Sequence, residues 1–221
     1  MDNVFNGLFD APPENNRFYG VTIGVVTNNK DEEKLGRVKV SFPWLDDQTE
    51  SNWARIATPM SGNKMGIFFL PEVGDEVLVA FEQGRMEFPY VIGSLWNGKE
   101  KPPEDNADGK NNLRFIQSRS GHIIRLDDTD GKEKIEIIDK SGKNTVVIDT
   151  KANSITVTSE GELTLEGKKD ITIKTSGGDV TIQGNNIELK AKGNLKAQAS
   201  GQGEMKSSGP MTIKGAVVKL N

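Results

Sequence analysis

The chain has 221 residues, of which 34% are hydrophobic and 6% aromatic, so it is long enough to form one or two domains with a buried core. Its net charge of -4 gives no general case for binding nucleic acid or a membrane, and the lack of cysteine excludes disulfides, thiol nucleophiles and cysteine-ligated metals. The single histidine, His122, excludes metal sites built on a histidine pair, and no apolar run approaches the ~18 residues that would span a bilayer. We therefore expect a non-enzymatic protein without a cofactor or a metal.

Residues 1–17 are predicted to be a docking segment. They are acidic, contain Pro12-Pro13, and lack the basic start and apolar stretch of a secretory signal. Four apolar side chains are spaced like a small patch suited to docking on a larger ring: Val4, Phe5, Leu8 and Phe9.

Residues 18–97 are typical of a small β-barrel of the OB type. Short β-branched or alternating runs, punctuated by Gly, Pro, Asn and Asp, predict strands at 21–26, 35–42, 53–57, 76–81 and 90–93. Arg37 and Lys39 alternate with Val38 and Val40, so the two cations are expected to point outward. A nucleic-acid-binding strip is one interpretation of them, but the net charge of -7 over residues 1–111 favours a solvated strand face.

The composition changes at residues 98–112, which we interpret as a linker. This run is polar, contains Pro102-Pro103, and is too short for an inserted domain. Thirteen of the 14 aromatic residues and eight of the nine prolines lie before residue 112, whereas residues 112–221 carry a net charge of +3.

Residues 113–221 are predicted to form a β-helical needle that begins with strands at 122–127, 133–138 and 144–148. Asp130-Gly131 and Ser141-Gly142 supply the turns. A calcium loop around Asp130 is disfavoured, because that pattern needs an acid at position 126 and a glutamate at position 137, where the chain has leucine and isoleucine.

From Ile155 onward, the sequence repeats in units of eight, each with the pattern apolar, polar, apolar, polar followed by a turn. The apolar positions expected to face inward are Ile155, Val157, Leu163, Leu165, Ile171, Ile173, Val180, Ile182, Ile187, Leu189, Leu195, Met211 and Ile213. Each unit offers two side chains worth about 1.5–3 kcal/mol when buried, against about 1–2 kcal/mol of backbone entropy for every ordered residue. An isolated unit is therefore unstable. Three units of one chain per coil, or one unit from each of three chains, would both solve this, and periodicity alone leaves the choice open.

Several linked motifs resemble the family of VgrG and phage baseplate protein V. Residues 35–44, 53–59, 66–81 and 89–98 resemble its OB module, and 120–122, 127–133, 135–137 and 218–221 resemble its needle. The resemblance implies an all-β chain with an N-terminal OB-fold barrel followed by an intertwined homotrimeric β-helix. It also implies a role as the structural central spike of a contractile injection machine, which pierces the target envelope and touches the membrane only transiently.

The same resemblance implies partners. Because about 17 residues precede the OB module, we expect a separate hub protein of the baseplate. A PAAR-type cap is expected at the needle tip, on Val218, Leu220 and Asn221, with cargo as a further partner. Some relatives carry a lysozyme domain between the OB module and the needle, but this linker is too short to hold one. Others carry a His-x-His iron site, which a single histidine cannot form. Assembly is expected in the bacterial cytoplasm, into a virion or injection particle.

Two alternatives remain open at this point. One is an OB module that binds an oligonucleotide or a glycan on a β-stalk, which the acidic first half disfavours. The other is a single-chain β-solenoid enzyme acting on polysaccharide, which the scattered carboxylates and the lone needle aromatic, Phe115, disfavour. Whether the machine is a phage tail, an extracellular injection particle or a secretion apparatus is not specified by these motifs.

Overall fold

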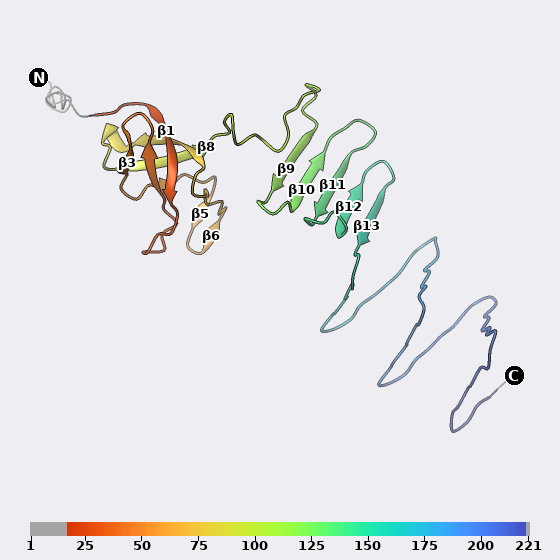
Figure 1. Cartoon of the computed structure of the whole chain (residues 1–221). Coiled ribbons are helices and arrows are strands. Elements are labelled where there is room, and N and C mark those ends of the chain that lie inside the picture. The colour runs from red at the N-terminus through yellow and green to blue at the C-terminus, as the bar shows by residue number, and fades with distance from the viewer. Residues whose placement is uncertain (1–16, 220–221) are drawn as a thin grey trace, which may run out of the picture. The chain divides into compact units, whose positions relative to one another are not determined.

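The structure is a computed structural model that describes residues 17–219. The described residues divide into two compact units, one ending at Glu162 and the other beginning at Leu163. The first unit holds a curled six-stranded sheet and a separate five-stranded sheet (Figure 1). Among the described residues, the only helical element is the short turn η1 (Glu82–Gly84), which confirms the prediction of an all-β chain.

The curled sheet has the strand order β3-β2-β1-β7-β8-β4. All of its pairs are antiparallel except β4 with β8. Next to β4, Ala54 exchanges two backbone hydrogen bonds with Val38, just before β2, so the two sides of the sheet approach each other as in a barrel. Its strands are β1 (Val21–Asn28), β2 (Lys39–Phe42), β3 (Asp46–Glu50), β4 (Arg55–Ile56), β7 (Glu76–Phe81) and β8 (Pro89–Ser94).

The core of this sheet follows from strict alternation along its strands. In β7, every second residue is buried, and the buried positions carry valine or phenylalanine, which suit a pleated surface. Phe18 closes one end by stacking on Trp44 at 5.3 Å between ring centroids and meeting Phe81 edge-on at 5.6 Å. The buried core consists of Val26, Val38, Val40, Phe42, Ala54, Val77, Val79, Phe81 and Val91.

Two predicted strands are shorter than expected. Of residues 53–57, only Arg55–Ile56 form β4, with an isolated bridge at Ala54 before it. Residues 35–42 were expected to be extended throughout, but β2 begins at Lys39. The reason is a loop centred on Asp31, whose carboxylate accepts backbone hydrogen bonds from Glu33, Leu35 and Arg37. Lys34 and Gly36 adopt positive φ angles of 60° and 71° in this loop, which is incompatible with a regular strand.

The second sheet is an antiparallel meander in the order β13-β12-β11-β10-β9. It follows the predicted turns at Gly131 and Gly142, which adopt φ angles of 68° and 72°. Every strand has five residues: β9 (Leu113–Gln117), β10 (Ile123–Asp127), β11 (Lys134–Ile138), β12 (Thr145–Asp149) and β13 (Ser154–Thr158). Strand β9 was not anticipated from the sequence.

The second unit is an extended chain that reverses direction repeatedly (Figure 1). Residues 163–219 form no hydrogen-bonded strand within this single chain, and all of them are exposed. The octad repeat is therefore present as extended segments and turns that are not paired into a sheet.

Candidate interaction surfaces

One face of the β9–β13 sheet is almost entirely apolar. Cross-strand partners lie on the same face of a sheet, as do residues two apart along a strand. Ile124 faces both Ile116 and Ile137, and Val146 continues this row to Val157. The complete apolar face is Ile116, Ile124, Leu126, Ile135, Ile137, Val146, Ile148, Ile155 and Val157, with Arg114 at one corner.

This apolar face is uncovered. The exposed fraction of its side chains ranges from 41% at Ile148 to 72% at Ile155, with Val146 alone half-buried. Water-exposed apolar patches of this extent are unusual on monomeric proteins and mark interaction surfaces. Only Ile155 and Val157 of this face were named as core positions from the sequence. The others could have been found from the same apolar-polar alternation in the preceding strands.

The opposite face of the same sheet carries charges in an alternating lattice. Glu136 is buried and accepts from Arg125 Nη2 at 2.6 Å, while Lys134 Nζ lies 3.3 Å from its other oxygen. Asp127 and Asp149 flank Lys134 in the register of the neighbouring strands. The same face also carries five half-buried apolar residues: Leu113, Phe115, Ile123, Ile138 and Val147. The sheet thus has one mixed face, which holds the ion pairs, and one face that is almost entirely apolar.

The predicted inward positions of residues 163–219 are exposed in the single chain. Their exposed fractions run from 47% at Met211 to 72% at Leu165. One ion pair shows where the polar positions lie. Lys190 Nζ is 2.8 Å from Glu188 Oε1, so the polar side chains before and after Leu189 point to the same side of the chain. The alternation therefore separates an apolar side from a polar side here as well.

The predicted docking residues are only partly described. Val4, Phe5, Leu8 and Phe9, expected at the hub, and Leu220 and Asn221, expected at the cap, lie outside the described residues. Val218 is described and is 48% exposed.

The cations of the predicted outward strip are engaged rather than free. Arg37 forms hydrogen bonds of 2.8 Å with both oxygens of Asp31, and Lys39 lies 3.1 Å from Glu50. Both cations also lie over the ring of Trp53, at 5.7 and 5.5 Å from its centroid. Phosphate binding would have to break these contacts. The two side chains are 17% and 30% exposed, so they pack on the strand face rather than extending freely into solvent as expected.

Asp31 is the organising group of this region. The hydrogen bonds from the Arg37 side chain, together with those from three backbone N–H groups, hold the pKa of Asp31 well below its usual range. The same pairing raises the pKa of Arg37. The loop that carries the exposed Leu35 is thereby fixed at neutral pH.

A groove of about 590 Å³ lies beside that loop. It runs between the loop and a hairpin formed by β5 (Ser61–Gly62) and β6 (Met65–Gly66), and the chain that follows contributes Phe68 and Phe69. Phe68 is 76% exposed. The groove is thus a partly apolar surface beside the curled sheet.

The turn at Asp130 is a structural turn. Lys132 N–H donates to the Thr129 carbonyl, Gly131 N–H donates to Glu133 Oε1, and Asp128 pairs with Arg114. Within residues 17–219, no group of three or more His, Asp or Glu side chains is arranged to hold a metal ion.

Comparison with known proteins identifies the curled sheet. Residues 22–96 match the family model of the type VI secretion system/phage-baseplate injector OB domain. Residues 22–96, about a third of the chain, are therefore assigned to this OB-domain family. The match contains β1, β2, β7 and β8, together with the loop of Asp31 and the groove beside it.

Curated relatives extend the similarity beyond the OB domain. The chain is 34% identical to the type VI secretion system spike protein VgrG5 of Pseudomonas aeruginosa over an alignment of 133 residues that covers 54% of this chain and 17% of that protein. It is 31% identical to VgrG1a and to VgrG4b of the same organism, over 53% and 58% of this chain. It covers 21% and 18% of those two proteins. The chain thus spans about a fifth of the length of these spike proteins.

A separate search for membrane-spanning elements was negative for the described part of the chain. No helix there is both long and apolar enough to cross a bilayer.

Proposed function

We propose that this protein is the structural central spike of a contractile injection machine, formed by three copies of the chain. The observation that carries the proposal is the exposed apolar face of the β9–β13 sheet, in a chain whose OB domain is of the injector type. The octads that follow in the sequence repeat the same apolar-polar alternation. Its named relatives are spike proteins of type VI secretion systems.

The physical case for self-association rests on two unsatisfied requirements. The apolar face leaves eight of its nine apolar side chains exposed, each worth about 1.5–3 kcal/mol when fully buried. Residues 163–219 also form no hydrogen-bonded strand within the single chain, and ordering them costs about 1–2 kcal/mol per residue. Three copies around one axis would cover the apolar faces and pair the extended segments, so both requirements favour an intertwined prism.

In this assembly, the two faces of the sheet have different roles. The apolar face and the apolar octad positions would turn toward the axis. The face that carries Arg125, Lys134 and Glu136 would point away from the axis. The proposed role is mechanical and non-catalytic, and the three-sided needle would be the element that pierces the target envelope.

The proposal extends to the partners at either end. The hub of the baseplate is expected to bind residues 2–16, and the groove near Phe68 offers a second apolar surface on the OB domain. Deleting residues 2–16 should leave the trimer intact but weaken particle assembly. A PAAR-type cap at Val218, Leu220 and Asn221 remains a prediction, tested by truncating residues 216–221 and measuring cap binding.

The spike assignment is tested by a matched pair of substitutions in one octad. Ile171→Asp would place three like charges near the axis, each costing several kcal/mol unless neutralised, whereas Thr172→Asp adds the same charge on the polar side. We expect light scattering to show loss of the trimer for the first variant and an intact trimer for the second. Trimers of equal thermal stability for both variants would refute the inward assignment.

A further inference from the structure

The positive charge of the chain is concentrated in residues 187–221. This stretch contains six Lys against two Glu, residues 163–186 contain three Lys against three acids, and residues 1–162 carry a net charge of -8. The cations beyond residue 162 are all lysines, and neither arginine nor an aromatic residue occurs there. The chain therefore passes from an acidic OB unit through a neutral stretch to a basic one.

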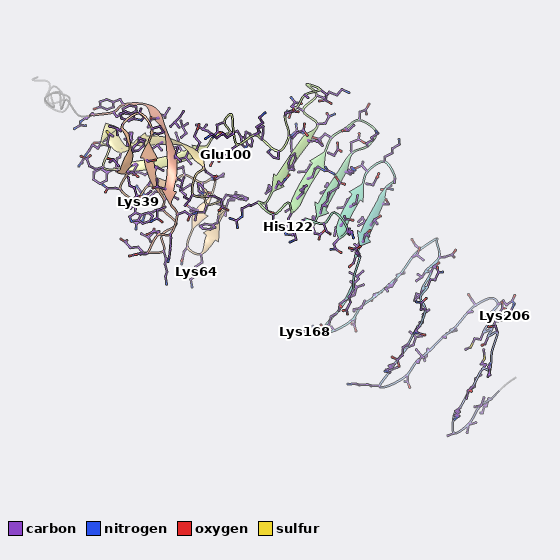
Figure 2. The ribbon with its side chains drawn as sticks, in the orientation of Figure 1. Lys39, Lys64, Glu100, His122, Lys168 and Lys206 are labelled. Atoms are coloured by element: carbon purple, nitrogen blue, oxygen red, sulfur yellow. The ribbon has the colours of Figure 1, made fainter. Side chains whose placement is uncertain are left out.

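The lysines of the basic stretch lie on the polar side of the octads. Lys190, Lys206 and Lys214 each follow directly on the second apolar residue of a unit, so alternation places them opposite the apolar pair. The Glu188–Lys190 contact shows this geometry, with both side chains more than two-thirds exposed. In Figure 2, Lys206 lies on the extended part of the chain, as does Lys168 of the neutral stretch.

The excess of positive charge in this stretch remains even if every Glu within it forms an ion pair in the assembly. If both Glu of residues 187–221 paired with lysines of the same or a neighbouring copy, four lysines per chain would still lack an acidic partner from this stretch. In the proposed trimer, on which this inference rests, twelve such lysines would surround one short section of the needle. The potential there would be strongly positive although the whole protein is acidic.

We propose that residues 187–219 form a lysine collar that binds membrane surfaces rich in anionic lipid headgroups. Lysine is a compact, strongly hydrated cation on a flexible stem, which suits delocalised attraction to headgroup phosphates rather than a defined two-pronged contact. Sequence-tolerant binding of single-stranded nucleic acid uses aromatic stacking platforms and arginine, and this stretch has neither. The collar would hold the needle against the envelope before it is driven through.

The test uses the full-length protein and two triple variants of equal charge. K196Q/K206Q/K214Q removes three lysines per chain from the collar, and the matched control K168Q/K169Q/K174Q removes three from the neutral stretch. Co-sedimentation is measured with vesicles of phosphatidylglycerol and phosphatidylcholine in equal parts, and with vesicles of phosphatidylcholine alone. Light scattering on the same samples reports the oligomeric state.

We expect the unmodified protein and the control to bind the anionic vesicles, to ignore the neutral ones, and to be released at about 0.5 M salt. The collar variant should lose about tenfold or more in apparent affinity while staying trimeric. Equal binding by the two variants, or no binding by an unmodified trimer, would overturn the collar and leave the spike untouched. Binding to duplex DNA as tight as to anionic vesicles would overturn the choice of lipid. A monomeric unmodified protein would instead contradict the proposed function itself.

Discussion

Arg125 and Glu136 face each other across β10 and β11, with Arg125 Nη2 at 2.6 Å and Nε at 2.7 Å from Glu136 Oε2. The Glu136 side chain is only 7% exposed, and the Lys134 ammonium lies on its other oxygen. A carboxylate shielded from water to this extent needs its cationic partners to stabilise its charge. The pair therefore joins the two central strands of the sheet on the face opposite the apolar one.

Removing this carboxylate should destabilise the sheet. Glu136→Ala leaves two cations side by side without their counter-charge, and we expect a loss of about 1–3 kcal/mol in the free energy of unfolding. Glu160→Ala is the control, because the Lys143–Glu160 pair is more than half exposed and should contribute less than about 1 kcal/mol. Urea unfolding of both variants measures the difference. Equal unfolding midpoints would show that the Arg125–Glu136 pair does not stabilise the sheet more than the exposed pair does.

The Asp31 carboxylate should make the OB domain sensitive to acid. Because the pKa of Asp31 is lowered in the folded state, its stabilising contribution is present above its ordinary pKa of about 3.9 and is lost as the pH falls below that value. Asp31→Asn should therefore lower the melting temperature at pH 7 and flatten its dependence on pH below about 4. Thermal melts across this range check both effects. A variant whose melting curve parallels that of the unmodified protein down to the lowest pH would contradict this role.

Gly66 should resist substitution. Its φ angle is 144°, and a Cβ at this position would lie 2.5 Å from the Met60 carbonyl oxygen. Gly66→Ala should cost about 1–3 kcal/mol and disturb the hairpin beside the groove. Gly93→Ala in β8 is the matched control, since its Cβ would meet nothing within 4 Å. Comparable melting temperatures for the two variants would refute the steric argument.

The assembled needle should be kinetically stable. Intertwined chains leave no free strand edge along the shaft, and separating them requires many strand pairs to break together. We expect the trimer to survive SDS electrophoresis without boiling and to dissociate after boiling. Ready dissociation in cold SDS would count heavily against intertwined chains.

Sequence reasoning worked where alternation and burial coincide. The strand predicted at 76–81 matches β7, because its valines alternate cleanly and fill the core. It failed where side-chain chemistry decides the backbone. The Asp31 carboxylate accepts hydrogen bonds from three backbone N–H groups, and the resulting loop shortens β2. Strand β3 is a run of polar residues, so it has no apolar-polar alternation to reveal it.

The interaction surfaces were also predicted only in part. The octad pattern identifies the apolar residues from Ile155 onward as core positions, but in the single chain their side chains are exposed to solvent. The extension of this surface to Ile116 and Ile124 depends on the cross-strand register, which places β9 and β10 residues in one row. That register comes from the lengths of the turns, and apolar spacing within a single strand does not contain it.

The central claim is that three copies of this chain form one needle, and mass in solution tests it most directly. Multi-angle light scattering on the full-length protein should give about three times 24.2 kDa, unchanged on dilution. A mass near 24.2 kDa, with the apolar face of β9–β13 exposed to water, would contradict the account.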